Sequence, residues 1–182
     1  MQFEKTKIEG VLIIKPDVFK DERGYFMESY SERKWKEAGL EYTFVQDNES
    51  MSAKGVLRGL HFQKPPFAQD KIVRVIRGAV MDVAVDLRKG SPTYGQHVCV
   101  ELTEENKWQF LLPAGMAHGF VTRQDDTVFA YKVTAPYAPE TEGCILWNDP
   151  DLGIDWKCEH PLLSAKDQKG VSFKDFDSPF VF

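Results

Sequence analysis

The stretch that decides the fold is AVMDVAVDL, residues 79–87. In an extended strand, successive side chains point to opposite faces. Asp82 and Asp86 therefore share one face of this strand, while the other face is apolar. This alternation predicts a β-strand with one face in the core and the other in water. The apolar face consists of Ala79, Met81, Val83, Val85 and Leu87.

The same rhythm recurs on both sides of this stretch. Short apolar or alternating runs bounded by turn residues favour an all-β domain. Turn signals occur at Gly78, at residues 89–92 (KGSP) and at residues 124–126 (QDD). This spacing predicts a sandwich or a jelly-roll barrel. The other runs are LRGLHFQ, KIVRVIR, HVCVEL, WQFLLPAG, HGFVT and TVFAYKVT.

Helix signals are few. The segment SERKWKEAG, residues 31–39, predicts a short helix that Ser31 caps and Gly39 ends, with Trp35 and Ala38 facing inward. A second serine, at position 164, predicts a short capped turn in SAKDQKG. The tail from about residue 154 looks irregular but is aromatic, so we expect it to pack on the barrel or on a partner chain. Its aromatic residues are Trp156, Phe173, Phe176, Phe180 and Phe182.

Chain length and net charge limit the classes of protein to which this sequence can belong. A chain of 182 residues suits one domain, and no repeat or linker divides it. The net charge of -5 argues against broad binding to nucleic acid or anionic membranes. The start, MQFEKTKIEG, lacks the apolar core of a signal peptide, and the three cysteines form no CxxC pair. We therefore expect a cytoplasmic protein with reduced thiols.

The segment LLPAGMAHGF, residues 111–120, contains Pro113, Gly115 and His118 in the PxGxxH spacing of the second motif of cupin-type barrels. A metal-binding cupin also needs an earlier HxH and a glutamate, because transition metals require about three or four protein ligands. The corresponding hairpin, IVRVIRGAVMDVAVDL, contains no histidine. The sequence therefore predicts no bound metal. His118 is open to two interpretations, a turn residue held by backbone hydrogen bonds or a ligand contact.

Three side chains could perform chemistry at the barrel mouth without a metal. His61 lies near the end of LRGLHFQ, Lys71 begins KIVRVIR, and Tyr131 shares a face with Phe129 and Val133. A neutral imidazole can accept a proton, a phenol can donate one, and an ammonium can stabilise an enolate oxygen. Together they suit proton abstraction beside a carbonyl. Each also has a structural interpretation, as a core histidine, a solvated strand end or a packed tyrosine.

Two relationships are not decided by spacing. Arg58 and His61 are three residues apart, so a regular strand would place them on opposite faces unless Gly59 bends the backbone. Asp167 could orient a histidine as a triad carboxylate does, or complete a capping box with Ser164. Both alternatives stay open at this point.

An ordered set of motifs resembles the dTDP-4-dehydrorhamnose 3,5-epimerase family. The set covers nearly the whole chain and consists of DERGYFMESY, VQDNES, GVLRGLHFQ, QDKIVRVIRGAVMDVAVDLRKGSPTYG, LPAGMAHGF and YKVTAPYAPETEG. This resemblance implies a cupin-like jelly-roll barrel and a sugar-nucleotide isomerase of rhamnose and cell-surface polysaccharide synthesis. It implies no cofactor. It also implies a homodimer in which residues from about 1 to 50 contribute to the partner's site.

The resemblance assigns roles to individual positions. His61 resembles the general base, Asp167 the carboxylate that orients it, Tyr131 the proton donor on the opposite face, and Lys71 the cation beside the keto oxygen. The contacts to diphosphate and sugar would be Arg23, Arg58 and His118. The contacts to the nucleotide and the cleft would be Phe26, Glu28, Gln46, Asp47, Asn48, Tyr137, Glu142 and Lys166.

Three other functions compete with this interpretation. A related enzyme could invert only one carbon of another dTDP-4-keto-6-deoxy sugar. A sugar-nucleotide-binding cupin without activity would keep the arginines and aromatics but would not need His61, Lys71 and Tyr131 together. A metal-dependent cupin oxygenase is disfavoured by the missing HxH.

Overall fold

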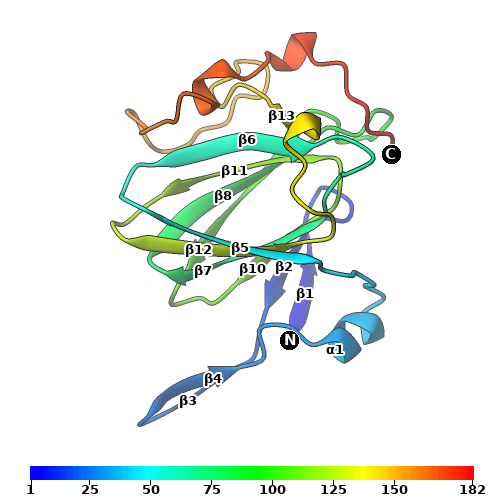
Figure 1. The fold of residues 1–182 in the computed structure, drawn as a ribbon. Coiled ribbons are helices and arrows are strands. Elements are labelled where there is room, and N and C mark those ends of the chain that lie inside the picture. Colours follow the sequence, from blue (N-terminus) through cyan, green and yellow to red (C-terminus); the bar gives the residue numbers. More distant parts are fainter.

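The computed structural model describes all 182 residues and consists mainly of two antiparallel sheets that face each other (Figure 1). One sheet has six strands in the order β1-β2-β10-β7-β12-β5, and the other has five in the order β13-β6-β11-β8-β9. The expectation of an all-β, cupin-like jelly roll is confirmed. The strands are β1 (Gln2–Lys5), β2 (Leu12–Lys15), β3 (Val18–Asp21), β4 (Gly24–Met27), β5 (Gln46–Ser52), β6 (Leu57–Gln63), β7 (Lys71–Arg77), β8 (Ala79–Asp86), β9 (His97–Thr103), β10 (Gln109–Leu112), β11 (Met116–Thr122), β12 (Thr127–Val133) and β13 (Glu142–Cys144).

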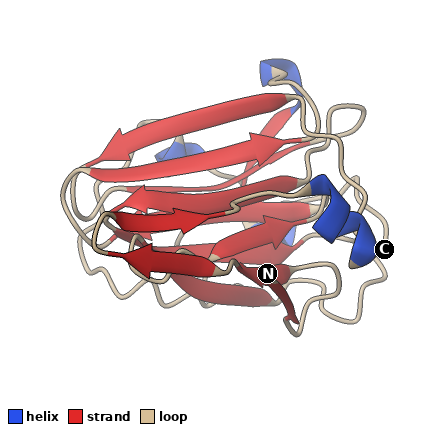
Figure 2. Ribbon diagram, turned by 90° about the horizontal axis from the view of Figure 1, so that it is seen from below, coloured by secondary structure: helices blue, strands red, loops and turns tan.

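Helices are short and lie at the margins of the sheets (Figure 2). They are α1 (Glu32–Glu37) and the 3-10 turns η1 (Pro139–Thr141), η2 (Asp167–Lys169) and η3 (Phe173–Asp175). The longest has six residues, and no helix is long and apolar enough to cross a membrane. In α1, Trp35 is buried and Gly39 follows at a positive φ of 76°, as expected. Ala38 is exposed, however, and the Ser31 side chain caps nothing.

The main core fills the space between the two sheets. Its largest members come from both layers, and they include Phe110, Phe120 and Phe129. Val80 and Ala84 of β8 belong to this core, so Asp82 between them faces the barrel interior. The expectation that Asp82 and Asp86 lie on a wet face is wrong, because both are fully buried.

The opposite face of the five-stranded sheet is covered by the C-terminal segment, which crosses the top of Figure 1 in orange and red. Met81, Val83 and Val85 of β8 form a second core with Trp156 and Phe180 of the tail. The expected packing of the aromatic tail on the barrel is therefore confirmed. This cover explains why every residue of β8 is buried, since one face meets the barrel interior and the other meets the tail.

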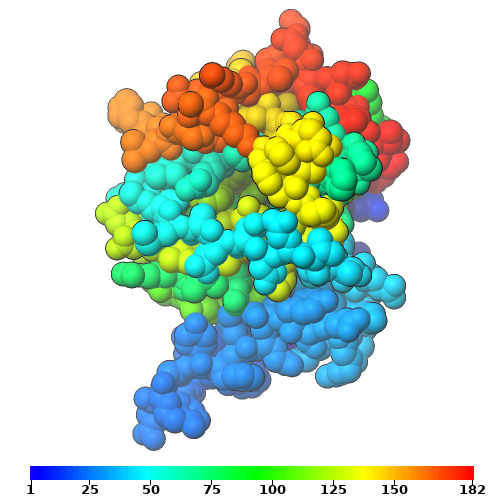
Figure 3. All heavy atoms as spheres, in the orientation of Figure 1, coloured from blue at the N-terminus to red at the C-terminus, as the bar shows by residue number.

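The N-terminal part lies on the outer side of the six-stranded sheet. There Trp35 joins Leu12, Ile14, Ile72 and Leu111 in a third core. The hairpin of β3 and β4 extends away from the barrel at the lower left of Figure 3. This hairpin, residues 18–27, is called the arm below.

Candidate active site

Arg58 and His61 lie on the same inner face of β6. In the register between β6 and β11, His61 is opposite His118 and Arg58 is opposite Phe120. Two residues of β6, Gly59 and Leu60, therefore lie opposite the single residue Gly119 of β11, which is a β-bulge. The bulge contains Gly59 at a φ of 146°, a conformation that favours glycine. The question that spacing left open is answered, because the bulge places both side chains on one face of β6.

His61 has a carboxylate beside it. Its Nε2 lies 2.7 Å from Oδ1 of Asp167, although the ring N–H is not aligned with that oxygen. The same Oδ1 accepts the backbone N–H of Gly59 at 3.2 Å. The neighbouring backbone groups of Leu60 bond to Ile145 in both directions. The Asp167 carboxylate thus takes the place of a backbone acceptor for Gly59, next to the Leu60–Ile145 pair. Nδ1 of His61 is left without a hydrogen-bond partner.

Asp167 makes contacts that fit both roles that the sequence left in competition. Its Oδ2 accepts the Oγ–H of Ser164 at 2.5 Å and the N–H of Ser164 at 3.2 Å. Its Oδ1 is thereby left for His61 and Gly59. Burial alone would raise the pKa of Asp167, but the close contact with His61 and the hydrogen bonds from Ser164 and Gly59 outweigh burial and hold the pKa well below its ordinary value. The carboxylate is therefore ionised and suited to stabilise an imidazolium.

His118 and Asp82 form a second pair beside the first. His118 Nε2 lies 2.9 Å from Asp82 Oδ1, and both residues are buried. Burial raises the pKa of Asp82, while His118 and Lys71 oppose this shift. The interpretation of His118 as a turn residue held by the backbone is wrong, because it lies within β11 and its partner is a carboxylate. Asp82 is not among the predicted site residues, because alternation along the strand predicts a solvent-facing position for it.

Tyr131 and Lys71 approach from the facing sheet. Tyr131 on β12 is opposite Val73 of β7, and its neighbour Phe129 belongs to the inner core, as the shared face predicted. Burial raises the pKa of Tyr131, with Arg58 opposing, so the phenol keeps its proton near neutral pH. Burial lowers the pKa of Lys71 to about 8, while Glu142 and Asp82 oppose the shift. Lys71 belongs to no ion pair.

Arg58 is the exposed cation on the same face of β6 as His61. Its only side-chain hydrogen bond goes to Oγ of Ser52, at 3.2 Å, and no carboxylate pairs with it. The guanidinium therefore keeps its donors for an anion. On β5, the edge strand of the facing sheet, Gln46 donates to Asn48 at 2.8 Å, and both side chains are half-buried.

Three predicted contact residues form a chain at the rim. Tyr137 donates its phenolic proton to Glu142 at 3.1 Å, and Glu142 forms an ion pair with Lys166. Glu142 also stands opposite Gln63 at the end of β6, which places the chain beside the His61 strand. These residues influence the pKa values of Lys71 and Tyr131, so they belong to the same cluster.

Four predicted contact residues do not meet His61 within one chain. Arg23 pairs with Asp21 at the tip of the arm, Phe26 is 67% exposed, and Glu28 pairs with Lys34. The fourth, Asp47, is exposed and pairs with Lys132 at 2.8 Å. Asp47 helps to line a depression of about 400 Å³ on the outer side of the six-stranded sheet. The barrel mouth of one chain is therefore made without the arm.

No three His, Cys, Asp or Glu side chains of the chain are arranged so that they could hold a metal ion. The three cysteines are free thiols. Cys144 stands opposite His61 in the register of β13 and β6, and burial raises its pKa to about 11. It is therefore a neutral thiol near the site. The site offers acid, base and cationic side chains for its chemistry.

Comparison with known proteins supports the same kind of chemistry. The family model described as dTDP-4-dehydrorhamnose 3,5-epimerase matches residues 5–175. A dTDP-4-dehydrorhamnose 3,5-epimerase of Pseudomonas aeruginosa is 53% identical over 179 residues, which covers 97% of this chain and 98% of that protein. The crystal structure of dTDP-6-deoxy-D-glucose-3,5-epimerase from Legionella pneumophila in complex with dTDP-4-keto-L-rhamnose has a TM-score of 0.95 and 46% identity, covering 100% of this chain and 98% of that one. A dTDP-4-dehydrorhamnose 3-epimerase of Streptomyces niveus is 41% identical over 172 residues, covering 94% of this chain and 83% of that protein.

Proposed function

Because the chain belongs to the dTDP-4-dehydrorhamnose 3,5-epimerase family, we propose that its barrel mouth converts dTDP-4-dehydro-6-deoxyglucose to dTDP-4-dehydrorhamnose. The enzyme is an isomerase that inverts C3 and C5 of the sugar. Both carbons flank the C4 carbonyl, so their protons are acidified by the same group. One base and one cation beside the keto oxygen can therefore serve both carbons in turn.

The observation that carries this proposal is the placement of acid and base on facing sheets. His61 with Asp167 belongs to the five-stranded sheet, and Tyr131 belongs to the six-stranded sheet. His61 removes the proton from one face of the sugar, and Asp167 stabilises the imidazolium that forms. Tyr131 then returns a proton to the opposite face, which inverts the carbon. The raised pKa of Tyr131 suits this role, because the phenol must be protonated to donate.

Lys71 and Arg58 supply the positive charge. The negative charge of the enolate develops on the C4 oxygen, where a preorganised ammonium is most effective in a water-poor site. We assign this task to Lys71, whose amine has no salt-bridge partner to satisfy. Arg58 holds the diphosphate, since a guanidinium without a protein carboxylate can bind two phosphate oxygens at once. His118, held by Asp82, contributes a further contact to the sugar or the diphosphate.

We also infer that the enzyme works as a homodimer in the cytoplasm. The arm exposes Phe19, Tyr25 and Phe26 by 64%, 54% and 67%, which is a large apolar surface for so short a hairpin. A second chain would cover this surface and bring Arg23 and Phe26 to its own barrel mouth. The free thiols of the chain suit a reducing compartment.

Solvent-deuterium exchange tests the proposed function directly. The wild-type enzyme is incubated in D₂O with dTDP-4-dehydro-6-deoxyglucose, and the C3 and C5 positions are followed by NMR. Deuterium should enter at both carbons with formation of dTDP-4-dehydrorhamnose. Exchange at one carbon alone would reassign the enzyme to the single-carbon class. No exchange, with dTDP still bound, would indicate a sugar-nucleotide-binding protein without activity.

A further inference from the structure

The C-terminal segment contains the same short motif twice. Residues 164–167 read SAKD and residues 172–175 read SFKD. In each copy the serine Oγ–H donates to the aspartate Oδ2, at 2.5 Å in the first and 2.7 Å in the second. In each copy the same Oγ accepts the aspartate N–H at 3.2 Å. The two copies therefore share the same pair of serine–aspartate hydrogen bonds, although the backbone turn closes at Gln168 in the first and at Asp175 in the second.

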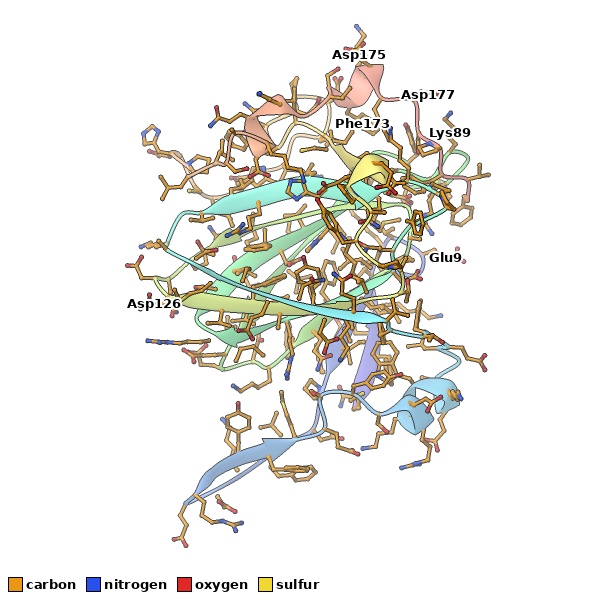
Figure 4. The ribbon with its side chains drawn as sticks, in the orientation of Figure 1. Glu9, Lys89, Asp126, Phe173, Asp175 and Asp177 are labelled. Atoms are coloured by element: carbon orange, nitrogen blue, oxygen red, sulfur yellow. The ribbon has the colours of Figure 1, made fainter.

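The copies differ in what the aspartate reaches. Asp175 is exposed at the top of Figure 4, and its carboxylate accepts a single hydrogen bond, from Oγ of Ser172. Asp167 is only 2% exposed, and its Oδ1 reaches Nε2 of His61 and the N–H of Gly59. One copy thus ends in solvent, while the other ends at the proposed base.

Ser164 decides which oxygen of Asp167 faces the base. Its N–H and its Oγ–H both donate to Oδ2, so this oxygen is held on the side of the turn. Oδ1 is then directed to His61. Without the hydroxyl, Oδ2 would keep only the longer backbone contact of 3.2 Å, and the carboxylate could rotate about its Cβ–Cγ bond.

We propose that Ser164 is a positioning residue for the His61 base, acting through Asp167. The SFKD copy at residues 172–175 stabilises only its own turn. This inference rests on the proposed role of His61 and extends it to a residue that does not touch the substrate.

The hydroxyl also influences the charge of the pair. After burial, which acts in the opposite direction, the bonds from His61 and Ser164 are the main causes of the lowered pKa of Asp167. Removing the Ser164 hydroxyl takes away one of these bonds, so Asp167 becomes a stronger base and interacts more strongly with an imidazolium at His61. Cys144 stays a neutral thiol because burial raises its pKa to about 11. The other titratable groups around the pair, which the substitution leaves in place, are His118, Glu142 and Lys166.

The experiment compares Ser164→Ala with Ser172→Ala, because both remove a serine hydroxyl that makes the same two hydrogen bonds to the aspartate three residues later. For each variant, kcat/KM is measured from about pH 5 to pH 9, together with KM, dTDP affinity and the thermal midpoint. We expect Ser164→Ala to lose about tenfold in kcat/KM, by analogy with groups that orient a functional histidine through its outer partner. Its acid limb should move to higher pH while dTDP affinity is unchanged. Ser164→Thr, which keeps the hydroxyl, should restore activity and the pH profile.

The control defines what would overturn the inference. Ser172→Ala should keep the wild-type kcat/KM and acid limb even if it lowers the thermal midpoint as much as Ser164→Ala does. An unshifted acid limb in Ser164→Ala, or an equal loss in both variants, would contradict the positioning role. A wild-type enzyme without C3 and C5 exchange, or an active His61→Ala variant, would instead contradict the proposed function. The two failures are therefore distinguishable.

Discussion

Arg58 and His61 lie on one face of β6 because the strand contains one residue more than the facing segment of β11. A regular strand would have separated the proposed phosphate ligand from the proposed base. In the proposed function, this arrangement lets a single strand hold one end of the substrate and deprotonate the other. It also places both side chains opposite a second sheet, from which Tyr131 and Lys71 approach.

The bulge depends on Gly59. A Cβ at this position would lie 2.6 Å from Cα of Gly119, and the φ of 146° is unfavourable for other residues. We expect Gly59→Ala to lower the free energy of unfolding by roughly 3–5 kcal/mol and to weaken dTDP binding. Gly55→Ala is the control, because it has a positive φ but open space, and should cost only about 1–2 kcal/mol. Equal losses in urea unfolding would show that the contact with Gly119 is unimportant.

Arg58 should dominate diphosphate binding. A charge-assisted hydrogen bond contributes about 1.5–3 kcal/mol, so Arg58→Ala should weaken dTDP binding roughly 10- to 100-fold. The control is Lys89→Ala. It removes a surface cation that pairs with Asp177 of the C-terminal segment (Figure 4). Calorimetry should give wild-type affinity for this control. Unchanged dTDP affinity in Arg58→Ala would mean that its guanidinium does not contact the diphosphate.

Lys71 should set the alkaline limb of activity. Burial lowers its pKa to about 8, so the ammonium loses its charge as pH rises through this value. We expect kcat/KM to fall above about pH 8, because the neutral amine stabilises an enolate poorly. Tyr131 would lose its proton only at higher pH, since burial raises its pKa. Lys71→Gln should be slow and should lack the limb near pH 8, and a limb that persists in this variant would belong to another group.

Mixed dimers test the arm. One chain carries His61→Ala and an intact arm, and the other carries Arg23→Ala with Phe26→Ala and an intact His61. If the arm acts in the partner's site, half of the randomly mixed dimers contain one complete site, so about a quarter of wild-type activity should return on co-expression. Each variant alone should be much less active. Absence of recovery, or a mass of one chain by light scattering with full activity, would contradict the shared site.

The strands were predictable from the sequence because alternation and turn residues are local signals. AVMDVAVDL indeed forms a strand, β8, which lies between β11 and β9 in its sheet. Its burial was not predictable in the same way, because the tail that covers its second face comes from residues far along the chain. The local pattern therefore predicts a solvent-facing Asp82, whereas the structure buries it. A short-range pattern cannot reveal a cover that is formed by long-range packing.

The candidate site, like the fold, could be predicted only in part from the sequence. The single chain brings His61, Asp167, Tyr131 and Lys71 to the barrel mouth, but their chemistry became visible in the sequence only through family motifs, since each residue alone has a structural interpretation. The common face of Arg58 and His61 depends on a register shift, which alternation cannot predict. The arm residues Arg23 and Phe26 remain predictions for a partner's site.

The central claim is that base and acid act from opposite faces of the sugar. His61→Ala should lose both solvent exchange of the C3 and C5 protons and net inversion, because no enolate forms without proton abstraction. Tyr131→Phe keeps the ring but lacks the phenolic proton, so His61 can still remove a proton and return it to the original face.

The most direct measurement is therefore the ratio of deuterium exchange to net inversion in these two variants, followed by NMR in D₂O. The account predicts that Tyr131→Phe retains measurable exchange while inversion falls by about 10²–10⁴-fold, the usual contribution of a positioned acid or base. It predicts that His61→Ala loses both. Equal loss of exchange and inversion in Tyr131→Phe, or continued exchange in His61→Ala, would contradict the two-face mechanism.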